Sequence, residues 1–188
     1  MEITTTIETE RLLLKKPTAK DALSEYKIIK SDDFYKVTHV PKTYTKKMAE
    51  EFSKYCAKDF GKGSLTYFMF LKETGEHIGN IGFATLFKRD NAALGAYLIS
   101  KDHRRKGYTS EGFKAIMNYA FKEMKLNRIS IGHIANNKAS EGVIKKMGFE
   151  FIGIEKKAVL TGEGKYKDHY IYQMLRTQWK PNKIKLKE

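Results

Sequence analysis

Residues 93–99, with the sequence ALGAYLI, constrain the fold more than any other segment of the chain. A strand that faces water on one side alternates apolar and polar residues, whereas a strand covered on both faces is apolar throughout. The segment therefore predicts a buried strand in a sheet with helices on both faces. A basic loop follows it, and then comes the clearest helical pattern of the chain, whose apolar residues recur at intervals of three and four. These residues are Phe113, Ile116, Met117, Ala120, Phe121 and Met124.

The other patterned segments predict a mixed sheet around this strand. The strand-like segments are residues 12–14, 65–71, 78–87, 92–100, 129–134, 149–160 and 166–175. Helices are predicted after Thr18, around residues 48–56, over residues 113–124 and around residues 143–147, where Gly148 ends the last one. The order β-α-α-β-β-β-α-β-α-β-β predicts an α/β (α+β) fold with helices on the faces of the sheet. No repeat or long linker interrupts this order, so we predict one domain over residues 1–179 and a basic tail over residues 180–188.

Composition and charge restrict the classes of protein to which this chain can belong. The chain has 188 residues, enough to bury a core, and its single cysteine, Cys56, excludes an internal disulfide. The first ten residues lack the regions of a signal peptide, and no apolar run is long enough to span a bilayer, so we predict a cytoplasmic protein without membrane contact. The 36 Lys and Arg against 22 Asp and Glu give a formal net charge of +14. Such a charge favours an anionic partner such as a nucleotide, RNA or the ribosome, although it also serves solubility alone.

A basic loop joins the buried strand to the clearest helix. Residues 103–111, with the sequence HRRKGYTSE, lead directly into the N-terminus of that helix. Free backbone N–H groups and the helix dipole favour an anion there, and arginine adds charge-assisted hydrogen bonds to phosphate. Gly107 lets the backbone curl close to a pyrophosphate. The loop matches neither a Walker A motif nor a dinucleotide fingerprint, and taken alone it also fits a basic turn with Thr109 or Ser110 as the N-cap.

The neighbours of this loop extend the pattern. Residues 104–109, RRKGYT, resemble the Arg/Gln-x-x-Gly-x-Gly/Ala loop of the GNAT acetyltransferase superfamily, which lies between the fourth strand and a long helix. The segments NKAS at 137–140 and KKMGF at 145–149 follow in that family's order. The start TERLLL at 9–14 and the end KDHYIY at 167–172 are similar to the Rim-type branch, which includes ribosomal-protein N-terminal acetyltransferases.

The resemblance, which covers residues 7–179, implies a fold and a cofactor. It implies a mostly antiparallel sheet that splays apart between its fourth and fifth strands, with acetyl-CoA in the gap and no metal. The Ile99 amide is implied to polarise the thioester carbonyl, and Ser140 to protonate the departing thiolate. Asn137 and Ser140 also suit the first turn of a helix as capping residues. The implied cofactor-binding residues are Leu98, Ile99, Arg104, Arg105, Lys106, Gly107, Tyr108, Thr109, Ser110 and Asn137.

The sequence departs from the resemblance at the groups that move protons. Many Rim-type members carry a glutamate at the position of Leu94, and the superfamily's frequent acid tyrosine falls at Ile144. Neither of these side chains can exchange a proton. His103 is expected to adjoin the cofactor, and the substitute bases, each of a type more often structural, are Tyr35, His39, His77, Tyr97 and His133.

The reaction implied is direct attack of a neutral amine on the thioester. An α-amino group, with a pKa of about 8, is partly neutral at physiological pH, whereas a lysine amine, near 10.4, needs a stronger base. We therefore predict an acetyl-CoA-dependent N-acetyltransferase for a protein or peptide N-terminus, ribosomal ones included, that is a monomer or a homodimer. The alternatives are acetylation of a small amine such as an antibiotic or polyamine, a non-catalytic acetyl-CoA-binding module, and an RNA- or ribosome-binding protein.

Overall fold

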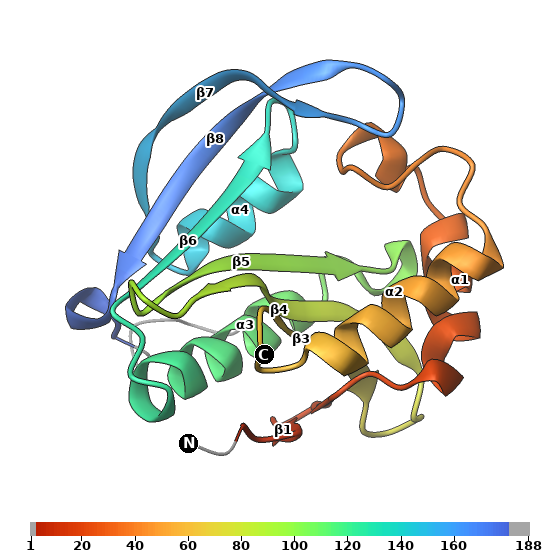
Figure 1. The fold of residues 1–188 in the computed structure, drawn as a ribbon, viewed down its shortest axis with the longest axis horizontal. Coiled ribbons are helices and arrows are strands. Elements are labelled where there is room, and N and C mark those ends of the chain that lie inside the picture. The colour runs from red at the N-terminus through yellow and green to blue at the C-terminus, as the bar shows by residue number, and fades with distance from the viewer. Residues whose placement is uncertain (1–2, 181–188) are drawn as a thin grey trace.

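The computed structural model describes residues 3–180, in which eight strands form one sheet in the order β1-β2-β3-β4-β5-β6-β8-β7 (Figure 1). Every neighbouring pair is antiparallel except β5 and β6, which are parallel. The mixed, mostly antiparallel α/β fold is therefore confirmed, with β1 as an added edge strand. The strands are β1 (Thr6–Glu8), β2 (Leu12–Lys15), β3 (Leu65–Leu71), β4 (His77–Phe87), β5 (Ala92–Ile99), β6 (Arg128–Ile134), β7 (Glu150–Leu160) and β8 (Tyr166–Leu175).

Helices cover both faces of the sheet, as the apolar strand predicts. Successive residues of β3 show the two layers, because Phe68 stacks on Phe52 of α2, whereas the side chain of Met69 lies beside Gly112 of α3. The helices are α1 (Ala22–Lys30) and α2 (Lys46–Asp59) on one face, and α3 (Tyr108–Asn118) and α4 (Lys138–Lys146) on the other. Shorter helical turns are η1 (Ala19–Asp21), η2 (Phe34–Lys36), η3 (Lys101–His103), the π-helical η4 (Tyr119–Glu123) and η5 (Arg176–Gln178).

The helix predicted over residues 113–124 begins earlier than its apolar pattern. The structure starts α3 at Tyr108 and continues it through η4 to Glu123. The apolar pattern does not reach this first turn because Thr109, Ser110 and Glu111 are polar, yet all three residues are buried, and Glu111 is bonded to Thr9 and Arg11. The helix therefore starts inside the basic loop, which places its free N–H groups next to the loop's glycine.

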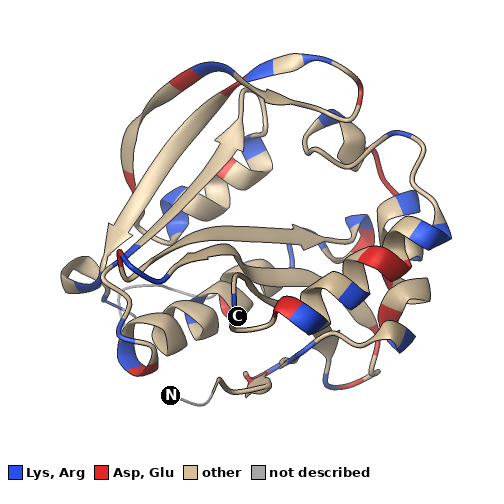
Figure 2. Ribbon diagram, viewed as in Figure 1, with Lys and Arg blue, Asp and Glu red and all other residues tan. Residues whose placement is uncertain are grey.

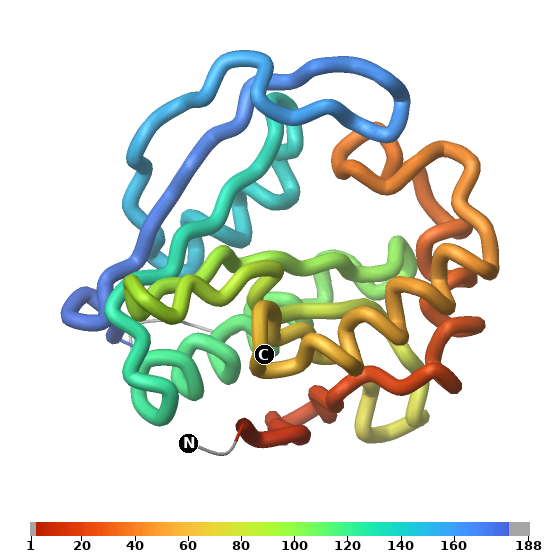
Figure 3. The backbone as a smooth tube through the Cα atoms, in the orientation of Figure 1, coloured from red at the N-terminus to blue at the C-terminus, as the bar shows by residue number. Residues whose placement is uncertain are grey.

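The sheet splays apart where β5 and β6 diverge. The two strands pair only from Ala92 with Arg128 to Leu94 with Ser130, after which β6 pairs with β8 alone. Figures 1 and 3 show β6, β8 and β7 swinging away from β5 beyond this point. Ala92 and Ala93 are buried as predicted, but Ala96, which lies beyond the last β5–β6 pair, is exposed. The predicted splay is confirmed.

Two further predictions concern membrane-spanning segments and the C-terminal tail. No helix within residues 3–180 is long and apolar enough to cross a membrane. The predicted basic tail, residues 180–188, lies outside the described part of the chain except for Lys180.

Candidate active site

The opening between β5 and β6 exposes backbone groups of β5. Hydrogen bonds on an antiparallel strand alternate between its two sides. The Ser100 N–H donates to the Ile78 carbonyl on β4 at 2.8 Å, so the N–H of the preceding residue, Ile99, points to the opposite side, toward the gap. Leu98 belongs to the β4 ladder, and its side chain packs against a small apolar cluster of α1 and η2. Of the two residues predicted at this strand end, Ile99 is the one whose amide faces the gap.

The basic loop ends in a cationic cavity at the N-terminus of α3. Gly107 is the N-cap residue of α3 with φ of +82°, and Arg105 also has a positive φ, +62°. This left-handed backbone turns the loop around the first helical turn, whose N–H groups have no partners within the helix. The cavity has a volume of about 470 Å³. Its lining residues are His103, Arg105, Gly107, Tyr108, Thr109, Ser110, Lys138, Ala139, Gly142, Val143 and Lys146, with no carboxylate among them.

The sequence pointed to the residues on one side of this cavity but not to those on the other side. Arg105 and the segment 107–110, which are predicted to bind the cofactor, line it, and five of the eleven lining residues come from α4. Lys138, Gly142 and Lys146 are four residues apart and therefore share one face of that helix. A basic residue at each end of this spacing was the available signal, but nothing in the local pattern says that the face turns toward α3.

Arg104 and Lys106 take other positions. The Arg104 guanidinium forms an ion pair with Asp32 and lies 5.3 Å from the centre of the Phe34 ring. Arg104 is therefore outside the cavity lining, and it joins the basic loop to the segment that follows α1. The Lys106 side chain is exposed, and its carbonyl accepts a hydrogen bond from Arg11 Nη1 at 3.1 Å.

A buried ion pair that the sequence did not predict anchors the loop from behind. The Glu111 carboxylate, in the first turn of α3, accepts hydrogen bonds from Thr9 Oγ1 at 2.6 Å and from Arg11 N at 2.8 Å and Nε at 2.7 Å. Burial raises the pKa of Glu111, but these hydrogen bonds and the Arg11 charge outweigh it and hold the pKa below its usual value. The Arg11 guanidinium also lies 4.7 Å from the centre of the Tyr108 ring. The pair fixes the start of α3 and neutralises a carboxylate that follows directly after Ser110, a residue of the cavity lining.

Asn137 and Ser140 meet β5 at the start of α4. Asn137 Oδ1 accepts the Ser140 N–H at 3.1 Å, so Asn137 is the N-cap residue of α4, the structural role that its sequence position allows. The Ser140 hydroxyl does not cap the helix. It lies 2.7 Å from the hydroxyl of Tyr97 on β5. These contacts bring a hydroxyl pair to the opening of the sheet.

The candidate bases are engaged in structural contacts. The His77 ring stacks on Phe68 at 4.5 Å and is bonded to Ser24 Oγ at 2.8 Å and the Gly79 carbonyl at 3.0 Å. Burial lowers the pKa of His77 to about 4, with the bond to Gly79 opposing the shift. His133 is bonded on both ring nitrogens, to the Ile134 carbonyl at 2.9 Å and the Tyr172 hydroxyl at 3.3 Å.

The other residues discussed from the sequence lie in the cavity wall, in the core or on β5. His103 lines the cavity and is bonded to Ser100 Oγ at 2.7 Å. Ile144 is buried in the core, as is Cys56. Leu94 forms the last parallel pair before the splay.

A second, smaller cavity lies beside η2. Its volume is about 220 Å³, and its lining residues are Ile29, Lys30, Asp32, Asp33, Tyr35, Val40, Pro41, Lys42 and Tyr44. The loop that lines it is bonded to the β7–β8 turn, since Gly162 N donates to the Thr38 carbonyl at 2.9 Å and His39 Nδ1 to the Leu160 carbonyl at 3.0 Å. Figure 3 shows the loop and this turn meeting across the open end of the splay. We call this contact the loop–hairpin seam.

Comparison with known proteins places this geometry in a family. The model of the acetyltransferase (GNAT) domain matches residues 11–150. An uncharacterized N-acetyltransferase of Bacillus subtilis (strain 168), YnaD, is 30% identical over 92% of this chain and 98% of its own length. The ribosomal protein uS5-alanine N-acetyltransferase of Escherichia coli (strain K12) is 27% identical over 65% of this chain and 63% of its own. The microcin C7 self-immunity acetyltransferase MccE, solved with acetyl-CoA and AMP, superposes with a TM-score of 0.83 at 20% identity, covering 93% of this chain and 97% of that one. The chain belongs to the GNAT family of N-acetyltransferases.

Proposed function

We propose that this N-acetyltransferase binds acetyl-CoA at the opening of its sheet and transfers the acetyl group to the amino terminus of a protein or peptide in the cytoplasm. The observation that carries the cofactor site is the cavity at the N-terminus of α3. Arg105, Lys138 and Lys146 surround it, and the free N–H groups of a helix point into it. A pyrophosphate needs this combination of charge and backbone donors.

The remainder of the cofactor follows the splay from this cavity. The arm that links the pyrophosphate to the thioester would run between β5 and β6, where the Ile99 N–H is free to donate to the thioester carbonyl. The neutral amine would attack the carbonyl carbon and the C–S bond would break, so that CoA leaves as the thiolate next to Ser140 while the nitrogen releases its extra proton to water. The backbone N–H of Ile99 would act through its position in the transition state, so no particular side chain is required at residue 99.

The acceptor is proposed from chemistry and from relatives. The E. coli relative is named for acetylating an alanine of a ribosomal protein. An α-amino group is partly neutral at physiological pH and needs little help from a base. His77 and His133 are engaged in hydrogen bonds and Leu94 cannot accept a proton, which also favours such an acceptor. The second cavity, with Asp32 and Asp33 in its wall, is where we expect the acceptor chain to enter.

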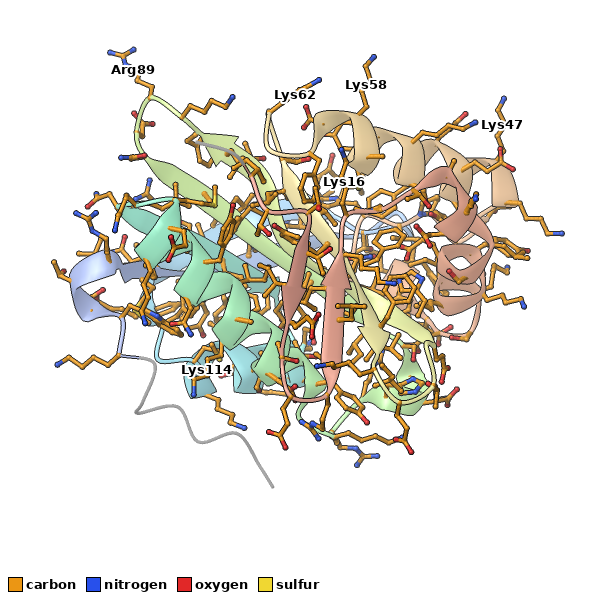
Figure 4. All side chains as sticks on the ribbon, turned by 90° about the horizontal axis from the view of Figure 1, so that it is seen from below. Lys16, Lys47, Lys58, Lys62, Arg89 and Lys114 are labelled. Carbon is orange, nitrogen blue, oxygen red and sulfur yellow. The ribbon has the colours of Figure 1, made fainter. Side chains whose placement is uncertain are left out.

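The basic charge of the chain is not gathered at this site. Figure 2 shows Lys and Arg on the helices of both layers with acidic residues between them. In Figure 4, Lys47, Lys58 and Lys62 extend outward into solvent around α2 and the turn that follows it. This distribution favours a general role in solubility or ribosome proximity over an RNA-binding groove.

The function is tested by measuring CoA release from acetyl-CoA with a panel of acceptors. The panel holds peptides that differ in their N-terminal residue, the same peptides with a blocked N-terminus, polyamines and aminoglycosides. Turnover of free but not blocked peptides is the expected result. Turnover of small amines alone would show that the acceptor is a small amine and not a protein or peptide N-terminus. Acetyl-CoA binding without turnover of any acceptor in the panel would favour a non-catalytic binding module.

Gly107→Glu is expected to weaken acetyl-CoA binding at least about tenfold while the fold stays intact. A Cβ at residue 107, on a backbone with φ of +82°, would lie 3.3 Å from Arg11 Nη2, so the substitution strains the loop and adds a negative charge beside the proposed pyrophosphate site. Binding is measured by calorimetry and folding by circular dichroism. The matched control is Gly164→Glu in the β7–β8 turn, with φ of +81° and open space around its Cβ position. Equal affinities for both variants would show that the cofactor phosphates lie elsewhere.

Gly162→Ala is expected to raise the acceptor KM several-fold without changing acetyl-CoA affinity. A Cβ at residue 162 would lie 1.7 Å from the Val40 carbonyl oxygen, so the loop–hairpin seam must separate. Gly153→Ala on β7 is the control, because its Cβ would meet nothing within 4 Å. Steady-state kinetics on an accepted peptide gives both constants, and an unchanged acceptor KM would mean that the seam does not shape the acceptor site.

A further inference from the structure

The Tyr97 hydroxyl crosses the opening of the sheet to reach Ser140. Its oxygen lies 2.7 Å from Ser140 Oγ and 3.3 Å from the Ser140 carbonyl oxygen. Both partners are held in place, because the Tyr97 ring packs edge-on against Phe113 at 5.6 Å and the Ser140 N–H is bonded to Asn137. Residue 97 is on β5 beyond the last β5–β6 pair, so the contact is made by side chains and not by the sheet.

The Tyr97 and Ser140 hydroxyls each carry one proton that can be donated in a hydrogen bond. Tyr97 has one O–H, which can be donated to Ser140 Oγ or to the Ser140 carbonyl, and the carbonyl can only accept. When Tyr97 donates to Oγ, the Ser140 proton is free to be donated to a third group. Burial raises the pKa of Tyr97 to about 12, with the Ser140 bond opposing it, so Tyr97 stays a donor throughout the physiological range.

We infer that Tyr97 is a positioning residue that directs the Ser140 hydroxyl, as a hydrogen-bond donor, at the sulfur of the departing thiolate. The inference rests on the proposed function, which puts the thioester sulfur next to Ser140. Tyr97 donates to Oγ, and Oγ donates to the sulfur. No proton needs to be transferred for this effect, because the donor stabilises the negative charge that develops on sulfur as the C–S bond breaks.

The hydrogen bond predicts a property of the product complex that does not depend on the acceptor. A donor aimed at the sulfur stabilises the thiolate and therefore lowers the pKa of the bound CoA thiol. We expect its acid dissociation constant to be raised relative to free CoA in the wild-type protein. Ser140→Ala should lower this constant at least about tenfold, and Tyr97→Phe about three- to tenfold, because the serine remains but loses its orientation.

The experiment titrates the thiolate of bound CoA by its ultraviolet absorbance against pH, in the wild type, Tyr97→Phe, Ser140→Ala and the double variant. Tyr67→Phe is the matched control, since it removes a buried tyrosine hydroxyl that is bonded to the Thr4 carbonyl at 2.6 Å, outside this site. The expected result is a lower constant in the three site variants, with the double variant equal to Ser140→Ala because both residues act through one bond. With an accepted amine in hand, Tyr97→Phe should lower kcat about tenfold and leave the KM for acetyl-CoA unchanged.

Two results would overturn the inference, and they differ from failure of the proposed function. A titration that is the same in Tyr97→Phe as in the wild type would show that Tyr97 does not act on the sulfur. Additive effects of the two single substitutions would show that Tyr97 does not act through Ser140. Failure of the wild-type protein to bind CoA would instead contradict the proposed cofactor site.

Discussion

Replacement of Glu111 by alanine is expected to lower the free energy of unfolding by about 2–4 kcal/mol. The Glu111 side chain is 4% exposed and accepts bonds from Thr9 and from both the backbone and the guanidinium of Arg11. Its removal takes this acceptor away from the Arg11 N–H and Nε in the β1–β2 turn, whereas Thr9 Oγ1 keeps the Leu12 carbonyl at 3.2 Å. Because Arg11 is still 35% exposed and can reach water, the loss is smaller than for a fully buried pair. Denaturant unfolding followed by circular dichroism measures the difference.

Glu141→Ala is the matched control for this prediction. Glu141 is also in the first turn of a helix and pairs with Lys138 at 2.8 Å and Lys145 at 2.7 Å. Both lysine side chains are largely exposed and screened by water, so losing this network should destabilise the protein much less than losing the Glu111 contacts. Equal losses for the two variants would mean that the Glu111 contacts add nothing beyond a surface ion pair.

The same carboxylate gives the protein part of its acid sensitivity. The pKa of Glu111 is below 4.5 in the folded state, so as pH falls the unfolded chain takes up this proton first. The stabilisation is therefore present above about pH 4.5 and is lost as pH falls through the folded-state value. Unfolding free energies measured at several acidic pH values should fall less steeply for Glu111→Ala than for the wild type. A steeper fall in the variant would contradict the assigned direction of the shift.

The parts of the fold that were predictable depend on local periodicity. The apolar segment 93–99, the glycine of the basic loop and the helical repeat after it each have their signal within a few neighbouring residues. The sheet order and the splay followed from the family resemblance that these segments support. Strand β1 was not predicted because it has only three residues, two of them exposed, and so few residues show no periodicity.

What was not predictable depends on pairs that are far apart in the chain. Glu111 meets Arg11 across 100 residues, and Arg104 meets Asp32 across 72. Arg104, which is predicted to bind the cofactor, also pairs with Asp32, and no local sequence pattern indicates this partner. Tyr97 and Ser140 were each singled out for separate roles, and only the folded chain shows that they form one hydrogen-bonded pair.

Glu25→Gln is expected to stabilise the protein by about 2–4 kcal/mol at pH 8 and by almost nothing near pH 5. Glu25 is 1% exposed on α1, with Oε1 bonded to Asn80 at 3.2 Å and no hydrogen-bond partner for Oε2 among the described residues. Burial raises its pKa to about 8, with the Asn80 bond opposing the shift. Between about pH 4.5 and 8 the unfolded chain loses this proton and the folded chain keeps it, so stability falls as pH rises. Glutamine keeps the shape of the side chain and removes the ionisation.

His77, 3.9 Å from Glu25, changes stability in the opposite direction. Its pKa is lowered to about 4, so the unfolded chain binds a proton below about pH 6.5 that the folded chain does not, and stability rises with pH from about 4 to 6.5. The two slopes oppose each other from about pH 4.5 to 6.5, and above 6.5 only the Glu25 slope remains. Burial raises the pKa values of the neighbouring Tyr44 and Cys56, so neither group titrates in this range.

The measurement is the free energy of unfolding of the wild type and Glu25→Gln from pH 5 to 9. The wild type should be nearly flat from pH 5 to 6.5 and then lose about 1.4 kcal/mol for each further pH unit, up to about pH 8. Glu25→Gln should instead rise to pH 6.5 and stay level, so the two curves separate with increasing pH. Glu51→Gln, on the exposed face of α2, is the control for removing one negative charge and should run parallel to the wild type. Parallel curves for Glu25→Gln and the wild type would show that Glu25 is ionised in the folded protein, with a partner for its second oxygen.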